Sequence, residues 1–223
     1  MALPRILEPE VMDSRDDAAS YDAMDHTQVN TRFVDDLLAT GHELRDVLDL
    51  GTGTALIPIE LCRRESECRV MAGDLAISML ELARYNLEIT MLTHRIQLIQ
   101  IDAKQTPFAT GMFHTTISNS ILHHIPQPHD VLAESLRITA AGGLLFFRDL
   151  ARPNSLKVLD ELVATYAADA DDHARQLFRD SLHAALTIDE IRALVAEFGF
   201  AVDTAQMTSD RHWTWCARKP ESA

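Results

Sequence analysis

The sequence predicts an α/β fold: a doubly wound, mostly parallel sheet of seven strands with helices on both faces. Strand-like apolar runs and helix-like segments alternate from residue 46 to residue 149, which is the order that βαβ units produce. Polar residues also lie at the carboxyl ends of five predicted strands, as expected at the sheet edge where ligands bind. These five residues are Asp49, Asp74, Asp102, Asn119 and Asp149.

The elements of the first half follow from apolar spacing. Residues 27–40 place Phe33, Val34 and Leu37 on one helical face, and Gly41 ends that helix. Short apolar runs predict strands, and apolar residues at intervals of three or four predict helices. The further predicted elements are strands at 46–50, 68–74, 96–101 and 113–118 and helices from Leu56, at 77–90 and at 130–138.

The second half begins with a turn at 141–143 and a strand at 144–149 that is apolar on both faces, as a central parallel strand should be. Thr187 and Glu190 form a capping-box pattern at the start of a helix that stops at Gly199. The other predicted elements are helices at 154–166 and 176–186, strands at about 200–206 and 212–217, and a hairpin turn at 208–211.

Composition restricts the class of partner. The chain has 223 residues, of which 34 are acidic and 20 basic, so its net charge is −14. This length suits one domain with a full sheet core. A strongly negative field repels nucleic acid, so the sequence favours a small-molecule substrate and predicts no nucleic-acid partner.

The three cysteines are Cys62, Cys68 and Cys216, and none of them forms a C-x-x-C pair. They indicate neither a disulfide framework nor a zinc site, and we predict no metal. No stretch approaches the roughly 18 apolar residues of a membrane span, and no leader pattern opens the chain. A cytoplasmic protein without membrane contact is expected; its oligomeric state is not predicted.

The segment from Val47 to Ala55 reads as a strand, an acidic residue and a glycine turn that opens a helix. Gly51 and Gly53 lack Cβ atoms, so a ligand can lie against the backbone there. A dinucleotide turn would carry a third glycine where this chain has Leu56, which disfavours a pyrophosphate. The carboxylate of Asp49 better matches a ligand with a cationic amine.

This segment resembles motif I, D-x-G-x-G-x-G, of the class I S-adenosylmethionine-dependent methyltransferases. Asp49, Gly51 and Gly53 match the motif, and Ala55 stands at the third glycine. The resemblance covers residues 20–150 well and the tail more loosely. It implies a Rossmann-like fold with an antiparallel last strand, S-adenosylmethionine as cofactor and S-adenosylhomocysteine as product.

Further cofactor contacts are expected at the next strand ends. The Asp74 carboxylate can accept hydrogen bonds from both ribose hydroxyls; a solvated aspartate at the strand end or a helix N-cap is the alternative. Leu75 follows it and is expected to pack on the adenine. By the resemblance, Asp102 would bind the adenine amino group beside Ala103; an ordinary loop aspartate is the alternative. Asn119 is a further cofactor-binding candidate, because it ends the fourth strand.

Four residues are candidates for closing the site or moving a proton. In many members of the resembled family an aromatic residue before the sheet closes over the cofactor, which makes Tyr21 a candidate; a plain surface arm is the alternative. His123 and His124 follow a strand end that should face the transferred methyl, and histidine titrates near neutral pH. Adjacent side chains usually point apart, so we expect at most one to reach the acceptor. His183 is the third candidate.

We predict a single domain, residues 1–223, in four parts. These are an N-terminal arm with helices (1–41), a cofactor-binding core (42–150), a helical lid (151–186) and a C-terminal helix with strands (187–223). In the resembled family an insertion at the third part commonly shapes the substrate pocket. Here it carries Arg179, Asp180 and His183, and an ordinary surface helix is the alternative.

The predicted function is S-adenosylmethionine-dependent methyl transfer to a small-molecule acceptor by in-line displacement. An RNA or protein methyltransferase with the same core is less favoured, because of the charge and because neither N-P-P-Y nor D-P-P-Y follows the fourth strand. A non-catalytic cofactor-binding protein is a second alternative. A nicotinamide dehydrogenase ranks last because of Leu56.

Overall fold

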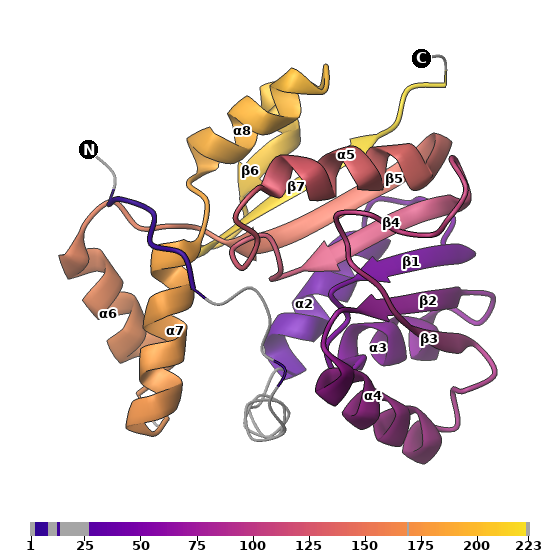
Figure 1. The fold of residues 1–223 in the computed structure, drawn as a ribbon, viewed down its shortest axis with the longest axis horizontal. Coiled ribbons are helices and arrows are strands. Elements are labelled where there is room, and N and C mark those ends of the chain that lie inside the picture. The colour runs from indigo at the N-terminus through magenta and orange to yellow at the C-terminus, as the bar shows by residue number, and fades with distance from the viewer. Residues whose placement is uncertain (1–2, 9–12, 14–26, 169, 222–223) are drawn as a thin grey trace. The chain divides into compact units, whose positions relative to one another are not determined.

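The computed structural model describes residues 3–8, 13, 27–168 and 170–221. Its strands form one seven-stranded sheet in the order β3-β2-β1-β4-β5-β7-β6 (Figure 1). Neighbours β3, β2, β1 and β4 pair in parallel, whereas β6 and β7 pair antiparallel. The predicted mostly parallel sheet is confirmed. The strands are β1 (Asp46–Leu50), β2 (Arg69–Asp74), β3 (Ile96–Gln100), β4 (Phe113–Asn119), β5 (Thr139–Leu150), β6 (Ala205–Met207) and β7 (His212–Arg218).

The helices begin and end close to their predicted positions. The capping box of Thr187 and Glu190 is present at the start of α8, with hydrogen bonds of 3.2 and 2.8 Å. Among the residues described, every helix is too short or too polar to cross a lipid bilayer. The helices are α2 (Thr27–Leu38), α3 (Leu56–Arg64), α4 (Ile77–Thr90), α5 (Pro128–Ile138), α6 (Leu156–Tyr166), α7 (Asp172–Ala184) and α8 (Ile188–Glu197).

The chain divides into two compact units. The larger unit holds the described residues of 11–119, 130–147 and 217–223. The smaller unit holds those of 1–10, 120–129 and 148–216. The predicted division into four parts of one domain is a different partition of the chain and stays a prediction.

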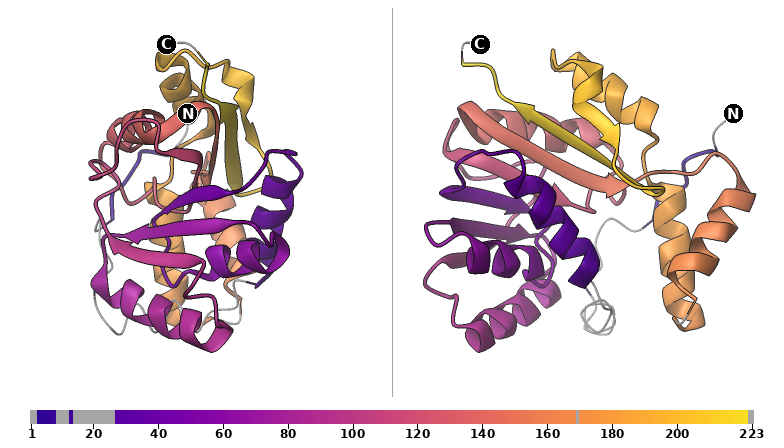
Figure 2. Two further views of the ribbon diagram at one scale, coloured as in Figure 1. Left: turned by 90° about the vertical axis from the view of Figure 1, so that its right-hand side faces the viewer. Right: turned by 180° about the vertical axis from the view of Figure 1, so that it is seen from behind.

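In the larger unit, β1 lies between β2 and β4, where the strand order reverses. Val47, Leu48 and Leu50 are fully buried there, as expected for a strand covered on both faces. Helix α2 covers one face of the sheet and α5 the other (Figures 1 and 2). Phe33 of α2 packs edge-on against Phe146 of β5, with ring centroids 5.1 Å apart. This reversal point is where parallel sheets bind ligands.

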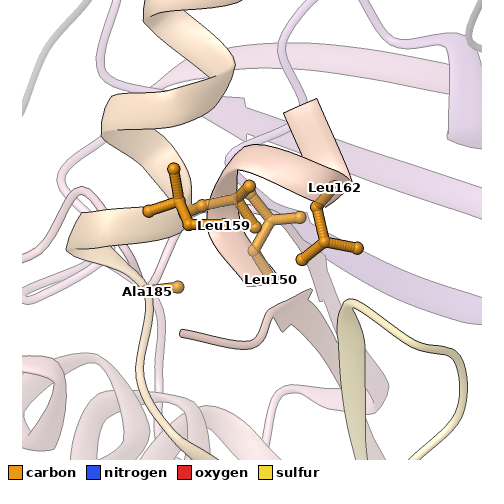
Figure 3. Close-up of a cluster of buried hydrophobic side chains, with 5 residues drawn as sticks. Leu150, Leu159, Leu162 and Ala185 are labelled. Atoms are coloured by element: carbon orange, nitrogen blue, oxygen red, sulfur yellow. The ribbon is translucent and has the colours of Figure 1, made fainter. Parts of the chain in front are cut away.

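The smaller unit has its own apolar cluster around α6 and α7 (Figure 3). Leu150 at the end of β5 packs with Leu159 and Leu162 of α6. Leu182 and Ala185 from α7 and its end complete the buried set. The predicted helices at 154–166 and 176–186 therefore exist because they bury an apolar face against each other.

Two predicted boundaries are wrong. The expected turn at 141–143 lies inside β5, because Gly142 N donates to Lys219 O (2.9 Å) and Lys219 N donates to Gly143 O (2.8 Å). Gly142 reaches this pairing at φ +72°. The strand expected at 200–206 is reduced to β6, because residues 202–204 form a 3-10 turn closed by Thr204 N and Ala201 O.

The loop after β3 is held by a carboxylate of α5. Glu134 is 8% exposed, and its Oε1 accepts hydrogen bonds from Thr106 N (2.7 Å) and Thr106 Oγ1 (2.5 Å). Arg137 Nη2 donates to the same oxygen at 2.7 Å. The hydrogen bonds from Arg137, aided by those from Thr106, lower the pKa of Glu134 to about 2.

Glu134→Gln should therefore reduce the free energy of unfolding at pH 7 by about 1.5–3 kcal/mol, the range for hydrogen bonds to a charged group. The folded-state pKa is depressed, so this stability is present above the ordinary pKa of 4.5 and is lost as pH falls towards 2. Urea unfolding from pH 7 to pH 2 would show the two proteins converging. Glu67→Gln, at an exposed position, is the control; equal stability of the Glu134 variant at every pH would refute the assignment.

Candidate functional site

The glycine turn after β1 has the backbone conformation that its sequence predicts. Gly51 and Gly53 adopt φ angles of +73° and +55°, and Ala55 adopts +63°. A left-handed conformation costs a residue with a Cβ about 1–2 kcal/mol, so Ala55 is strained where the motif has glycine. Gly51 N and Thr52 N both donate to Gly73 O at 2.9 Å. The turn is thus fixed to the end of β2.

Asp74, at the end of β2, fastens the same turn. Its Oδ2 accepts from Gly53 N at 2.7 Å and its Oδ1 accepts from Ala76 N at 2.9 Å, just before α4. Burial raises the pKa of Asp74 above its ordinary value. Each carboxylate oxygen has a further lone pair, so the ribose role predicted for Asp74 is compatible with these two bonds.

A pocket opens beside the turn, within the larger unit. Two of its lining residues, Asp49 and Asn119, come from the ends of the adjacent strands β1 and β4. Asn119 Oδ1 is buried and accepts no hydrogen bond from any described residue. A buried acceptor without a partner is costly, which makes it available to a ligand. The full lining is Asn30, Asp49, Gly51, Thr52, Leu56, Ile57 and Asn119.

Asn30 was missed by the sequence prediction. It lies in α2, a helix whose only sequence signal was its apolar packing face. A polar residue on the other face of such a helix looks like an ordinary solvated position. Only the packing of α2 beside the glycine turn identifies it.

The Asp49 carboxyl group is 2% exposed. Burial raises its pKa to about 7, and the nearby carboxyl group of Asp74 adds to the rise. A buried carboxylate is stabilised by an adjacent cation. The pocket therefore favours a ligand that brings a positive charge to Asp49.

The residues predicted to contact adenine lie at the ends of β2 and β3. Asp102 has a side chain that is 40% exposed and accepts from Lys104 N at 2.9 Å. Ala103 is half-buried, and Leu75 is 36% exposed. Their adenine roles stay predictions. Tyr21 lies outside the described residues.

A buried polar cluster lies in the smaller unit. His123 Nδ1 is 2.5 Å from Asp149 Oδ1, and Asp149 Oδ2 accepts from Leu122 N at 2.6 Å. His123 Nε2 lies 3.5 Å from Glu8 Oε1, and His124 Nδ1 lies 3.1 Å from the same oxygen. The two rings are 4.1 Å apart. The expectation that adjacent histidines point apart is therefore wrong, because both imidazoles turn towards Glu8.

Charge governs this cluster. Burial lowers the pKa of His123, but Asp149 and then Glu8 outweigh it, so the net pKa is raised. Burial raises the pKa of Asp149, and the His123 imidazole outweighs that effect, so its net pKa is lowered. The pair is consequently stabilised as an imidazolium and a carboxylate. Sequence reasoning missed Glu8, which is distant in the chain and carries no motif.

The third histidine, His183, stands on α7 apart from this arrangement. Its carbonyl oxygen accepts from Ile6 N at 3.2 Å. Arg179 hydrogen-bonds to Asp160 of α6. Asp180 accepts from Gln176 at 2.8 Å. These contacts within α6 and α7 are typical of a surface helix pair, and the lid role stays a prediction.

Solved structures share this fold along nearly the whole chain. A putative S-adenosyl-L-methionine-dependent methyltransferase from Methanococcus maripaludis superposes with a TM-score of 0.71 at 15% identity, covering 98% of this chain and 99% of that one. A SAM-dependent methyltransferase from Aquifex aeolicus gives 0.70 at 13% identity, covering 92% and 98%. At these identities the likeness concerns the fold.

Sequence comparison adds the family. A malonyl-[acyl-carrier protein] O-methyltransferase from Geobacter sulfurreducens is 34% identical over 185 residues, which are 82% of this chain and 66% of that protein. A ubiquinone/menaquinone biosynthesis C-methyltransferase from Dinoroseobacter shibae is 30% identical over 51% of this chain and 47% of its own length. The chain thus spans 66% or less of these relatives. Residues 47–143 match the family described as a methyltransferase domain. With the motif I turn, the strand-end carboxylates and the sheet order, these matches show that the chain belongs to the class I S-adenosylmethionine-dependent methyltransferases.

Proposed function

We propose that this chain transfers a methyl group from S-adenosylmethionine to a small-molecule acceptor by in-line displacement. The observation that carries the proposal is the pocket at the β1 turn. The amino-acid part of the cofactor carries an ammonium group, which can donate a hydrogen bond to the buried Asn119 Oδ1. The same ammonium group would stabilise the ionised form of Asp49, whose pKa is raised by burial. The cofactor, when bound, supplies an activated methyl group. The protein contributes alignment of the acceptor, which can account for much of the rate.

The remaining cofactor contacts are assigned by the strand ends. Asp74 would accept the ribose hydroxyls while it holds the glycine turn. Asp102, Ala103 and Leu75 would surround the adenine, since they follow β3 and β2 at the edge where parallel sheets bind ligands. Tyr21 is proposed to close over the cofactor.

The net charge of −14 supports a small-molecule acceptor over a nucleic acid. The two relatives are named for a malonyl group on an acyl carrier protein and for quinone biosynthesis. We include carrier-bound acyl groups among the acceptors to be tested. His123, His124 and His183 stay proposed for proton transfer. A cytoplasmic location is also proposed, because all three cysteines are free thiols.

Calorimetric titration with S-adenosylmethionine, S-adenosylhomocysteine and NAD tests the cofactor. We expect the first two to bind and NAD not to bind. A screen with cofactor labelled in its methyl group, against small acceptors, carrier-bound acyl groups, RNA and protein, then tests the acceptor class. Label transfer only to RNA or protein would contradict the proposal and indicate an RNA or protein methyltransferase. Cofactor binding without any methyl transfer would favour a non-catalytic role.

Asp74→Ala should weaken S-adenosylmethionine binding by about 1.5–3 kcal/mol, the range for hydrogen bonds to a charged group. Part of this loss would come from the turn, because Gly53 N loses its acceptor. Asp46→Ala, at the partly exposed opposite end of β1, is the matched control and should bind normally. Calorimetry measures both variants; wild-type affinity in Asp74→Ala would contradict the ribose assignment.

Cofactor affinity should depend on pH through Asp49. In the free protein this carboxyl group has a pKa of about 7, and an ammonium group would stabilise only its ionised form. Affinity should thus be highest between about pH 7 and 8 and fall by up to about tenfold for each pH unit below 7, since a proton must first leave Asp49. An α-amino group has a pKa of about 7.7–8.0 and is therefore charged at pH values below 7, so the ligand itself does not cause this fall in affinity.

Titrations from pH 5.5 to pH 7.5 measure this slope. Asp49→Asn cannot ionise, so its affinity should be lower at pH 7.5 and flat with pH. Asp46→Asn, at the start of the same strand, should retain the wild-type slope. A flat profile in the unaltered protein would remove Asp49 from the ammonium site.

We further propose that residues 151–186 select the acceptor, because the cofactor core is common to enzymes with different acceptors. Arg179→Ala and His183→Ala should then impair methyl transfer with little change in cofactor affinity. Hydrogen exchange across 170–186 should slow when cofactor and acceptor are both present. Unchanged exchange together with normal turnover in both variants would leave α7 as a surface helix.

A further inference from the structure

Three potential metal ligands converge in the smaller unit. Glu8, His123 and His124 each offer one atom, and these atoms all lie within 4.8 Å of one another. Two of the residues follow β4, and the third belongs to the N-terminal segment 3–8. The cluster shares no residue with the pocket lined by Asp49 and Asn119.

The spacing matches a coordination sphere. With metal–ligand bonds of about 2.0–2.2 Å, ligand atoms stand about 3.3–3.6 Å apart in a tetrahedral site and about 3.0 Å apart in an octahedral one. Glu8 Oε1 is 3.5 Å from His123 Nε2 and 3.1 Å from His124 Nδ1. These two distances suit a cation bound between Glu8 and each imidazole, and the third pair of ligand atoms lies within 4.8 Å.

The state of the Glu8 carboxylate points the same way. The Glu8 side chain is only 9% exposed, and its Oε1 is buried yet accepts no hydrogen bond from any described residue. The other oxygen, Oε2, accepts from Ser181 at 3.3 Å. The oxygen Oε1 faces two imidazole nitrogens without a hydrogen bond, an arrangement that a shared cation would satisfy.

Surrounding residues orient the ligands. Asp149 Oδ1 lies 2.5 Å from His123 Nδ1, so Nδ1 can keep its proton while a metal ion displaces the proton from Nε2, and the Nε2 lone pair then faces the same side as Glu8 Oε1. Metal-binding histidines nearly always donate their other ring N–H to such a carboxylate. Asp149 is itself fixed by Leu122 N and His123 N, at 2.6 and 3.2 Å.

We propose that Glu8, His123 and His124 bind one divalent transition-metal ion, Zn²⁺ in the first place. Two imidazoles and one carboxylate are the donors that Zn²⁺ accepts when it keeps a further position for water or a substrate oxygen. Mg²⁺ prefers oxygen ligands and should not compete. The ion would tie segment 3–8 to the loop after β4, and it would give His123 and His124 a role other than proton transfer.

The test uses the full chain, stripped with a chelator and dialysed. Zn²⁺ is titrated in competition with a chromophoric chelator, and elemental analysis gives the stoichiometry. We expect one Zn²⁺ per chain, a higher melting temperature in its presence, and no effect of Mg²⁺. Co²⁺ in place of Zn²⁺ should produce visible absorption bands from nitrogen and oxygen ligation.

Variants separate the site from adventitious binding. Glu8→Gln keeps the side-chain shape and should lower Zn²⁺ affinity at least a hundredfold and abolish the rise in melting temperature. Asp149→Asn should lower affinity about 10–100-fold, as orienting residues do. His183→Ala removes a histidine from the same unit outside the cluster and should bind Zn²⁺ normally.

The alternative is an ion-pair cluster in which an imidazolium bridges Asp149 and Glu8 without a metal. It predicts no tight stoichiometric Zn²⁺ binding by the unaltered chain, and that result would overturn the proposal. Wild-type affinity in both Glu8→Gln and His124→Ala would also overturn it. Circular dichroism of each variant shows that lost binding comes from a folded chain.

Discussion

The cofactor site depends on one contact, the hydrogen bond from Gly53 N to the Asp74 carboxylate. It joins the turn after β1 to the end of β2, and two further amide bonds to Gly73 O hold the same turn. Gly51 and Gly53 adopt the positive φ angles of this turn readily, because they lack a Cβ. The same carboxylate receives Ala76 N before α4, so one side chain sets the start of the helix and the shape of the turn together.

Two buried carboxyl groups show how surroundings divide the roles of otherwise similar residues. Asp49 and Asp149 both stand at or near strand ends and are 2% and 1% exposed. No described cation neutralises Asp49, so burial raises its pKa. His123 and backbone amides stabilise ionised Asp149 and lower its pKa despite burial. A cationic ligand could therefore stabilise ionised Asp49, whereas ionised Asp149 is already stabilised by the His123 imidazolium.

Local pattern predicted the elements whose cause is local. Helix α4 spans 77–90 as its apolar spacing indicated, and the hydroxyl and carboxylate of the capping box lie three residues apart. The turn expected at 141–143 failed because its pairing partner, Lys219, is remote in the chain. Asn30 and Glu8 were missed for the same reason, since packing alone brings them beside their sites. The carboxylates at strand ends were predictable because a parallel sheet aligns those ends by construction.

Glu8 is held in place by a neighbour that also lies outside any motif. Arg5 Nε donates to Ala184 O at 2.6 Å, and its Nη2 lies 3.0–3.2 Å from the carbonyl oxygens of Leu122, His123 and Ile125. One guanidinium thus joins segment 3–8 to the end of α7 and to the histidine loop, as its fork of donors allows. Burial lowers the pKa of Arg5, and the carboxylate of Glu190 opposes this. Arg5 thus fixes the backbone of the histidine loop against segment 3–8, and this holds both imidazoles within 3.5 Å of the Glu8 carboxylate.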